Sequence, residues 1–199
     1  TRDNLTDDEI KFLASYTGNG GGLTSKEGVR GSAYEYYTPK EVASAMWSLA
    51  ADMGFKGGSV LDPSAGTGIF AATSPTSALM NNVELSAVSG GIGKILNDGA
   101  RSNTVISNFE KQARVMPNDS HDMIITNVPF GDNGTRGNNK RDDDCYRSES
   151  LENYFILRSL EKLKPGGLAI FITPTSVVSG LAADKDRLRK ATSLTAEFL

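Results

Sequence analysis

The chain has 199 residues, 38% hydrophobic and 23% charged, with a formal net charge of −3. This length and composition predict one globular domain with a sizeable core. No apolar run reaches the ~18 residues of a membrane helix and no secretory signal is visible, so neither a membrane span nor secretion is expected. The lone Cys145 excludes an internal disulfide and fits a reducing cytoplasm, and a free-standing DNA-binding domain is usually basic rather than mildly acidic.

The first part of the chain predicts a helix followed by a loop. Thr6 and Glu9 stand at the spacing of a capping box, and apolar residues then recur with helical spacing. Residues 18–31 are rich in glycine and polar side chains and predict a loop, which is either a plain linker or a lid over a cofactor. We therefore expect residues 1–35 to form an N-terminal helix and glycine-rich loop, and residues 36–199 to form the main domain.

A second helix start follows at Tyr37-Thr38-Pro39. Thr38 suits the cap, Pro39 suits the first helical position, and Glu41 completes a capping box. The free amides at such a helix start favour an anion. Four apolar residues of this helix are expected to face the core: Val42, Ala45, Met46 and Leu49.

The next apolar run leads into a glycine-rich turn. Residues 59–61 predict a strand and residues 69–72 the start of a helix. Backbone can approach a ligand closely at glycine, and in open α/β sheets nucleotide-like ligands bind beside such turns. The turn consists of Asp62, Pro63, Ser64, Ala65, Gly66, Thr67 and Gly68.

The acid at the start of this turn narrows the choice of ligand. Asp62 repels a phosphate but pairs with an ammonium group, and Ile69 stands where a phosphate-binding loop has lysine. An adenosine joined to an amino acid, as in S-adenosylmethionine, suits these residues better than NAD or ATP. Glu84, about 20 residues beyond Asp62 on the next predicted strand, is placed to bind both ribose hydroxyls. Taken alone, the turn also fits an ordinary strand-to-helix connection.

Two further predicted strands end in polar residues. Residues 104–107 predict a strand that ends at Asn108-Phe109. His121–Thr126 predict a buried strand that continues into Asn127-Val128-Pro129-Phe130, with His121 at the far end and expected on the surface.

An almost entirely polar stretch, residues 131–150, predicts a solvated loop. Its three adjacent aspartates are only a weak signal for a metal ion, and no metal is expected. The loop also carries four cations that are candidates for contact with nucleic-acid phosphates: Arg136, Lys140, Arg141 and Arg147.

The last part of the chain continues the alternation of helices and strands. It predicts a helix over 151–163, a central buried strand over 168–172, a helix over 184–192 and the start of a sixth strand at 196–199. The whole pattern predicts an α/β fold, a doubly wound, mostly parallel, Rossmann-like sheet with helices on both faces. Because the chain stops inside an apolar run, we expect its C-terminal strands to be truncated and the chain to be a fragment.

The glycine turn and the Asn127 tetrapeptide together resemble two motifs of the amino-methyltransferases that modify adenine in DNA. The first motif of that family is similar to Asp-Pro-x-x-Gly-x-Gly, and its second is Asn/Asp/Ser-Pro-Pro-Phe/Tyr. Both occur here in the family's order, at the ends of two predicted strands. The pair is far more specific than either half.

The resemblance implies a set of residues around S-adenosylmethionine. Tyr37 and Thr38 would contact the carboxylate of the methionine moiety. Glu84 with Leu85 recurs in related proteins, and the residues that bind the adenine ring of the cofactor correspond to Asn108 and Phe109. From the residues alone, Asn108 and Phe109 fit a turn residue and a core aromatic nearly as well.

The resemblance also implies roles at the second motif. The side-chain oxygen of Asn127 and the main-chain carbonyl of Val128 would accept hydrogens from the target amine, with Pro129 completing the motif, and Phe130 would stack on a base flipped out of the duplex. Val128 departs from the family's first proline. It still supplies the carbonyl and, because it precedes Pro129, is restricted to extended conformations.

A narrower resemblance is to the methylase-like part of large phage or plasmid anti-restriction proteins. It implies a bacterial, phage or plasmid origin, DNA as a partner, and further recognition or helicase-like domains in the full-length protein. The leading hypothesis is methyl transfer to the exocyclic amine of adenine in DNA. Two alternatives stay open: a catalytically silent binding domain of the same fold, and a methyltransferase acting on protein glutamine, although Phe130 in place of tyrosine favours DNA.

Overall fold

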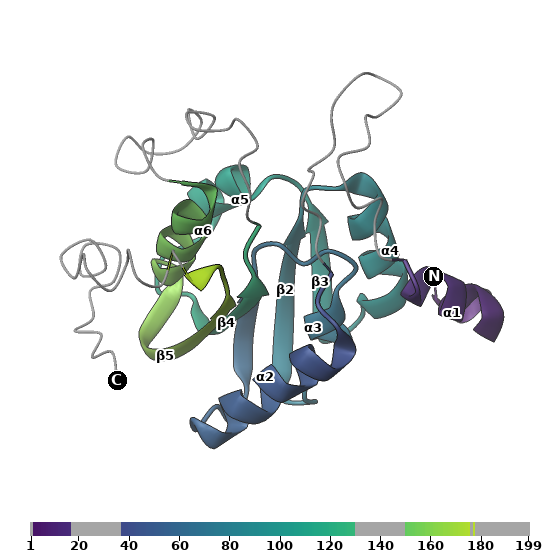
Figure 1. Cartoon of the computed structure of the whole chain (residues 1–199), viewed down its shortest axis with the longest axis horizontal. Coiled ribbons are helices and arrows are strands. Elements are labelled where there is room, and N and C mark those ends of the chain that lie inside the picture. The colour runs from purple at the N-terminus through teal and green to yellow at the C-terminus, as the bar shows by residue number, and fades with distance from the viewer. Residues whose placement is uncertain (1, 17–36, 130–149, 176, 178–199) are drawn as a thin grey trace.

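The computed structural model describes residues 2–16, 37–129, 150–175 and 177. Its five strands form one parallel sheet in the order β3-β2-β1-β4-β5 (Figure 1). The strands are β1 Gly58–Asp62, β2 Ala78–Glu84, β3 Ser102–Ile106, β4 His121–Asn127 and β5 Leu163–Ile172. The helices are α1 Asp7–Ala14, α2 Lys40–Asp52, α3 Ile69–Ala72, α4 Ala87–Asn97, α5 Phe109–Val115 and α6 Leu151–Leu160, after a 3₁₀ turn at Arg2–Asn4.

The strand order is that of a doubly wound fold, because the direction of winding reverses at β1. Chain segments lead outward from β1 through β2 to β3, and then return to place β4 on the other side of β1. Ligands of such sheets bind beyond the carboxyl ends of the strands at this reversal. The α/β fold class predicted from the sequence is confirmed.

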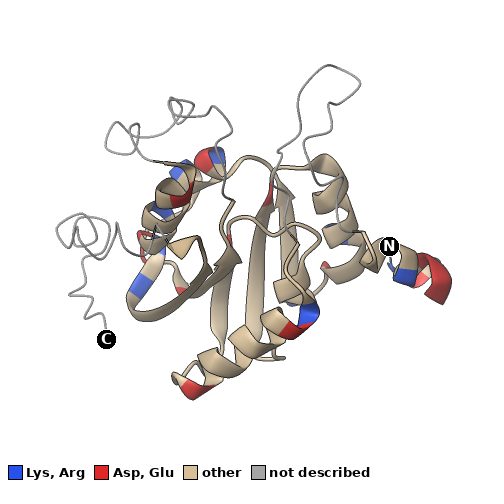
Figure 2. Cartoon of the chain, in the orientation of Figure 1, with Lys and Arg blue, Asp and Glu red and all other residues tan. Residues whose placement is uncertain are grey.

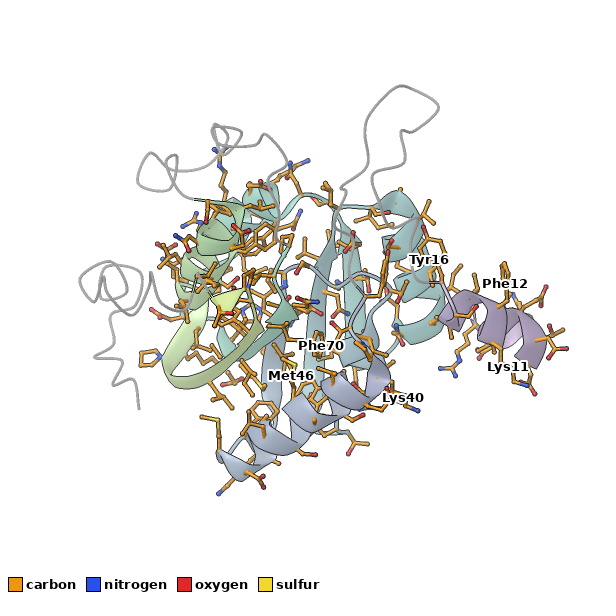
Figure 3. The ribbon with its side chains drawn as sticks, viewed as in Figure 1. Lys11, Phe12, Tyr16, Lys40, Met46 and Phe70 are labelled. Carbon is orange, nitrogen blue, oxygen red and sulfur yellow. The ribbon has the colours of Figure 1, made fainter. Side chains whose placement is uncertain are left out.

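Alternate residues of β1 enter two separate cores. Val60 packs with α2 and α3 on one face, where Met46 and Phe70 lie between helix and sheet (Figure 3). Leu61 packs with α5 and α6 on the other face. Burying one such side chain stabilises the fold by about 1.5–3 kcal/mol, so the two cores hold the helices against the sheet.

The N-terminal helix forms as expected at its start. The Thr6 hydroxyl accepts a hydrogen bond from the Glu9 amide, and the Glu9 carboxylate accepts one from the Thr6 amide, which completes the capping box. The helix packs against α4, while Phe12 projects away from the body of the protein (Figure 3).

The expected core face of α2 is partly wrong. Val42 and Leu49 are 41% and 47% exposed, and the buried residues of the helix are Ala43, Met46, Trp47 and Ala50. Trp47 settles the orientation, since its large side chain is buried and its indole nitrogen donates to the Phe70 carbonyl at 3.0 Å. Thr38 is also not the helix cap. Pro39 takes that position, without a side-chain capping bond.

The strand expected to be central, β5, lies at the edge of the described sheet. It pairs with β4 alone among the described strands, and it begins at Leu163 rather than at 168. Pro165 is accommodated because the pairing slips between His121 and Met123, which leaves Lys164–Gly167 outside the regular register.

Several expectations fall outside the described residues. These are the loops at 18–31 and 131–149, the helix at 184–192 and the strand at 196–199. Conversely, α5 was not predicted, because its seven residues are too few to show a clear helical period. No helix in the described ranges has both the length and the apolar character that a membrane crossing needs.

His121 was expected on the surface and is instead buried, with 4% of its area exposed at the start of β4. Its Nδ1 lies 2.9 Å from the Ser120 hydroxyl. Burial lowers the pKa of His121, and the charges of Lys164 and Lys162 act in the same direction, against a main-chain hydrogen bond at Lys162 and the charge of Asp122. The folded protein therefore holds the imidazole neutral more strongly than the unfolded chain does.

We predict a pH-dependent contribution of His121 to stability. The unfolded chain takes up this proton near the ordinary pKa of 6.5, and the folded chain does so only at lower pH. The free energy of unfolding should therefore fall as pH drops below 6.5, until the lowered pKa is passed. Urea unfolding followed by Trp47 fluorescence, compared with His121→Gln at each pH, isolates this contribution. A wild-type-minus-variant difference that does not change with pH would contradict it.

Candidate functional site

Three polar residues stand at the carboxyl ends of three neighbouring strands. Glu84 ends β2, Asp62 ends β1 and Asn127 ends β4. Because β1 lies between β2 and β4, the three side chains come from one edge of the sheet, at the reversal of winding. The motif expected to bind the cofactor and the motif expected to carry the reaction are at least 59 residues apart in the sequence. The fold brings them together here, because the Ser64 hydroxyl of the first donates to the Asn127 carbonyl of the second at 2.7 Å.

The glycine turn closes tightly after β1. The Ala65 amide donates to the Val83 carbonyl at 3.0 Å, and the Gly68 amide donates to the Ala65 carbonyl at 2.8 Å. Gly66 and Gly68 have φ values of 57° and 81°, in the left-handed region that favours glycine. A side chain at Gly66 would also meet the Tyr37 ring, at 3.3 Å.

Helix α4 approaches this turn through its own glycines. A Cβ at Gly93 would stand 3.4 Å from the Thr67 carbonyl carbon, and one at Gly90 would stand 2.9 Å from Ile106. The helix end also contacts the turn, since the side-chain Nδ2 of Asn97 donates to the Thr67 carbonyl at 3.0 Å. The turn is therefore supported from the side of α4 as well as by the sheet.

Glu84 holds the backbone around the turn. One carboxylate oxygen accepts the Gly66 amide and the other accepts the Ser86 amide, each at 2.7 Å. Leu85, its neighbour, is exposed beside it. A carboxylate oxygen accepts up to two hydrogen bonds, so these main-chain contacts are compatible with hydroxyl donors from a ligand.

Asp62 is a fully buried carboxyl group. Its Oδ1 accepts from the Thr126 hydroxyl at 2.8 Å and the Ser64 amide at 3.2 Å, while its Oδ2 has no hydrogen-bond partner among the described residues. Burial raises the pKa of Asp62 to about 7, against the lowering effect of the bonds from Thr126 and Ser64, and the charge of Glu84 raises it further. A cationic group of a ligand would offset the cost of ionising this buried acid.

The Asn127 side chain presents an acceptor without a donor. Its side-chain amide nitrogen donates to the Thr38 hydroxyl at 3.3 Å, while its Oδ1 is buried and has no partner within the part of the chain that the structure describes. The hydroxyl of Thr173, directly after β5, is likewise buried without a hydrogen-bond partner among the described residues. Buried polar atoms in proteins are rarely unpaired, and unpaired ones are costly. Three such atoms at one edge of the sheet, counting Asp62 Oδ2, indicate a site that a polar ligand completes.

The replacement of proline by Val128 is explained by packing. Its side chain is 1% exposed and belongs to the apolar core beneath α5 and α6. Its amide donates to the Ile172 carbonyl at 3.1 Å, a bond that a proline cannot make. Pro129 is partly buried, and Phe130 lies outside the described residues.

Tyr37 and Thr38 lie against both motifs. The Tyr37 hydroxyl is 2.7 Å from that of Ser89 in α4, and its ring meets Tyr16 edge to face at a centroid distance of 6.0 Å. Thr38 contacts Asn127, as described above. The structure thus brings this segment to the expected site, where its contact with a ligand carboxylate stays a prediction.

Asn108 and Phe109 are used by the fold itself. The Asn108 side chain caps α5 by accepting from the Lys111 amide at 3.1 Å. The Phe109 ring is buried against Phe155, at a centroid distance of 5.2 Å, and is not presented to an open crevice. Their contacts with an adenine ring also stay predictions.

Sequence reasoning assigned no role to Ser64 or Thr126. Both hydroxyls connect Asp62 with Asn127. The available signal was their position, since one follows the acid of the first motif by two residues and the other directly precedes the asparagine of the second. No group of three acidic, histidine or cysteine side chains in the described part of the chain is arranged to hold a metal ion.

The fold is similar to those of several solved methyltransferase structures. An inferred class I S-adenosylmethionine-dependent methyltransferase of Listeria monocytogenes aligns with a TM-score of 0.63 at 18% identity, over 96% of this chain and 61% of that one. An inferred RNA methyltransferase of Pyrococcus horikoshii aligns with a TM-score of 0.53 at 19% identity, over 92% and 83%. The modification subunit of an inferred type I restriction enzyme of Vibrio vulnificus gives 0.50 at 23%, over 73% and 36%. At these identities the likeness shows the fold.

One curated relative is much closer in sequence. The chain is 43% identical over 196 residues to the Defense against restriction protein B of Escherichia phage P1. The match covers 98% of this chain and 8% of that protein's length. The family model for N-6 DNA methylases matches residues 23–194, which include both motifs and the whole described sheet. The chain belongs to the N-6 DNA methylase family.

Proposed function

We propose that the chain binds S-adenosylmethionine beside the glycine turn and transfers its methyl group to the exocyclic amine of an adenine in DNA. The observation that carries this proposal is the buried, unpartnered Oδ1 of Asn127, next to the turn in a chain of the N-6 DNA methylase family. An acceptor held in place without a donor is suited to an amine hydrogen.

The residues around the turn fit S-adenosylmethionine chemically. The ammonium group of its amino acid would compensate the buried Asp62, whose Oδ2 has no partner. Glu84 would accept from the ribose hydroxyls, and at the glycines of the turn the backbone can approach a ligand closely. When bound, the cofactor supplies an electrophilic methyl group on a positively charged sulfur.

Asn127 and Val128 would prepare the amine for attack. The amine of adenine is conjugated with the ring, so its lone pair is a weak nucleophile. Hydrogen bonds from its two hydrogens to Asn127 Oδ1 and the Val128 carbonyl would favour a more tetrahedral nitrogen with a localised lone pair. That lone pair would accept the methyl group that a bound cofactor supplies, with the electrons of the broken carbon–sulfur bond staying on sulfur. The extra amine proton would pass to solvent, and orientation by these residues would supply much of the rate.

A second candidate function is a domain that binds the cofactor or DNA without turnover. The name of the phage relative refers to defence against restriction, and this chain spans 8% of that protein's length. In that case the chain would act as a binding domain within a larger protein and would not transfer a methyl group. A methyltransferase acting on protein glutamine is tested by the same assays with a different acceptor.

Glu84 provides the first test of cofactor binding. Glu84→Ala should weaken S-adenosylmethionine binding by about 1–3 kcal/mol in calorimetry, the cost of losing hydrogen bonds to a charged acceptor. Glu84→Gln should have an intermediate effect, because it retains one acceptor oxygen. The exposed Glu41→Ala is the matched control and should bind as the wild type does. Unchanged affinity in Glu84→Ala would remove this residue from the site.

Asn127 provides the test of catalysis. In full-length protein, Asn127→Ala should abolish methylation of unmodified DNA while leaving cofactor affinity nearly intact, because it removes an acceptor for the amine rather than for the cofactor. Asn103→Ala, an exposed asparagine of β3, serves as the control and should retain turnover. Equal methylation by wild type and Asn127→Ala would rule out the mechanism. Cofactor binding by a wild type that methylates no DNA would favour the silent domain.

The chain alone should bind duplex DNA weakly. Affinity for DNA comes largely from neutralising its phosphates, and the net charge here is −3. Over the described residues, Lys and Arg are scattered over helices, strand β5 and the connections, and form no continuous band in the view shown (Figure 2). We expect dissociation constants of about 10⁻⁴ to 10⁻⁶ M at physiological salt, measured by fluorescence anisotropy. Submicromolar, sequence-selective binding would show that the chain carries its own recognition element.

A further inference from the structure

Four residues form a continuous array of oxygen contacts between the two motifs. Asp62 Oδ1 lies 2.8 Å from the Thr126 hydroxyl, which lies 2.9 Å from the Ser64 hydroxyl. The Ser64 hydroxyl lies 2.7 Å from the main-chain carbonyl oxygen of Asn127. The array therefore connects the buried carboxyl group with the peptide bond between Asn127 and Val128.

The number of protons in this array depends on Asp62. Three contacts need three protons, and the two hydroxyls supply only two. If Asp62 is ionised, one contact joins two oxygens with no hydrogen between them. If Asp62 is protonated, its proton bridges to Thr126, the Thr126 proton to Ser64, and the Ser64 proton to the Asn127 carbonyl. Only the form with the proton on Asp62 Oδ1 satisfies every contact, because a proton on Oδ2 would leave the array one proton short.

Ionisation of Asp62 should reverse the direction of these hydrogen bonds. Hydrogen bonds to a charged group contribute about 1.5–3 kcal/mol and those between neutral groups about 0.5–1.5 kcal/mol. A chain of hydroxyls that all donate toward the anion is strengthened further by polarisation. The Ser64 proton would then turn to Thr126, and the Asn127 carbonyl would lose its donor.

We propose that Ser64 and Thr126 are positioning residues that transmit the protonation state of Asp62 to the Asn127 carbonyl. The proposal rests on the proposed function, because it makes a cationic ligand beside Asp62 release the Asn127 carbonyl, one residue before the Val128 carbonyl that would accept from the target amine. A site without ligand would hold the peptide bond between Asn127 and Val128, and a site with ligand would free it, so that the adjacent Val128 carbonyl could adjust to the target amine.

The surroundings of Asp62 are consistent with a group that changes protonation on ligand binding. Its pKa is raised to about 7, mainly by burial. Glu84 of β2 is the charged neighbour that acts on it, and its charge disfavours ionisation. The turn and β4 contribute the neutral groups of Ser64, Thr126 and Asn127. A ligand ammonium would supply the missing positive charge.

The first experiment is an NMR titration of the chain without ligand. The amide nitrogen shift of Val128 responds to hydrogen bonding at the preceding carbonyl, that of Asn127. This shift and the Asp62 side-chain carboxyl shift should titrate with one common midpoint near 7. In Thr126→Val and Ser64→Ala the Val128 shift should no longer follow Asp62, and in Asp62→Asn the shared transition should be absent.

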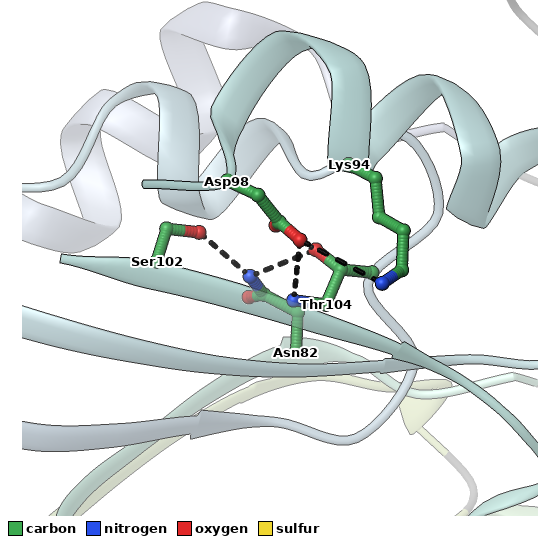
Figure 4. Close-up of polar contacts among 5 residues, drawn as sticks. All are labelled: Asn82, Lys94, Asp98, Ser102 and Thr104. Carbon is green, nitrogen blue, oxygen red and sulfur yellow. Dashed lines mark hydrogen bonds and ion pairs between the residues drawn. The ribbon is translucent and has the colours of Figure 1, made fainter. Parts of the chain in front are cut away.

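The matched control is Thr104→Val. Thr104 is also a buried strand threonine, and its hydroxyl donates to a carboxylate, Asp98 Oδ1, at 2.7 Å (Figure 4). This variant should leave the joint titration of Val128 and Asp62 unchanged. If the wild-type Val128 shift is flat where Asp62 titrates, the proposal is wrong, and this result does not depend on any variant folding.

The second experiment adds ligands with and without the ammonium group. At about pH 6, S-adenosylmethionine should move the Val128 resonance toward its high-pH position, whereas methylthioadenosine, which lacks the amino acid, should not. The affinity for S-adenosylmethionine should rise about tenfold per pH unit up to a pH near 7, because binding releases one proton. In Thr126→Val, the affinity should depend on pH with the same slope while the Val128 shift no longer follows Asp62. That result would support transmission through the two hydroxyls.

The two proposals fail in different ways. If Val128 titrates with Asp62 but no S-adenosylmethionine binds, the array stands and the proposed function is wrong. If S-adenosylmethionine binds with a pH-independent affinity and Val128 does not move, the array is only structural and the proposed function is untouched.

Discussion

The structure depends on one constraint, the burial of a carboxyl group at the point where the sheet reverses its winding. Asp62 ends the central strand, so both neighbouring strands and the glycine turn are arranged around it. No cation is among the groups that shift its pKa, and its partners are a hydroxyl and a main-chain amide. A buried acid in such surroundings is energetically unfavourable when ionised, and it persists in folds where the site gains from it. The cost is local, whereas two apolar cores of ordinary composition stabilise the rest of the chain.

The sequence predicted the parts of the fold that depend on local patterns. The alternation of apolar runs and helical periods specified a parallel α/β sheet, and the capping box placed the start of α1. The predictions from sequence failed where the burial of a residue or strand depends on the elements that pack against it. Helix α2 has apolar residues around most of its circumference, so the packing of Trp47 chose which of them are buried. The apolar run of β5 looked central, yet burial of a strand depends on what lies beside it.

In the candidate site, too, some residues could be predicted from the sequence and others could not. Its two motifs were visible because each has a rare combination of residue types, and the strand order then placed them together. The roles of Ser64 and Thr126 were not visible, because serine and threonine are common and their hydroxyls have many uses. Phe109 illustrates a different ambiguity. An aromatic residue after a strand suits a ligand ring and an apolar core equally; in the structure it contacts Tyr154 and Phe155, and its contact with an adenine ring stays a prediction.

The glycines of α4 have a consequence for how this domain moves. A Cβ at Gly90 would stand 2.9 Å from Ile106, whereas one at Gly93 would make ordinary contact with the turn and one at Gly91 would meet nothing within 4 Å. Each glycine lowers the intrinsic stability of a helix by about 1 kcal/mol relative to alanine, so this helix is held together mainly by what it touches. Its amide hydrogens should therefore exchange with solvent early, in local openings that loosen the glycine turn before the sheet itself unfolds. The helix that supports the glycine turn is thus also the element expected to open first.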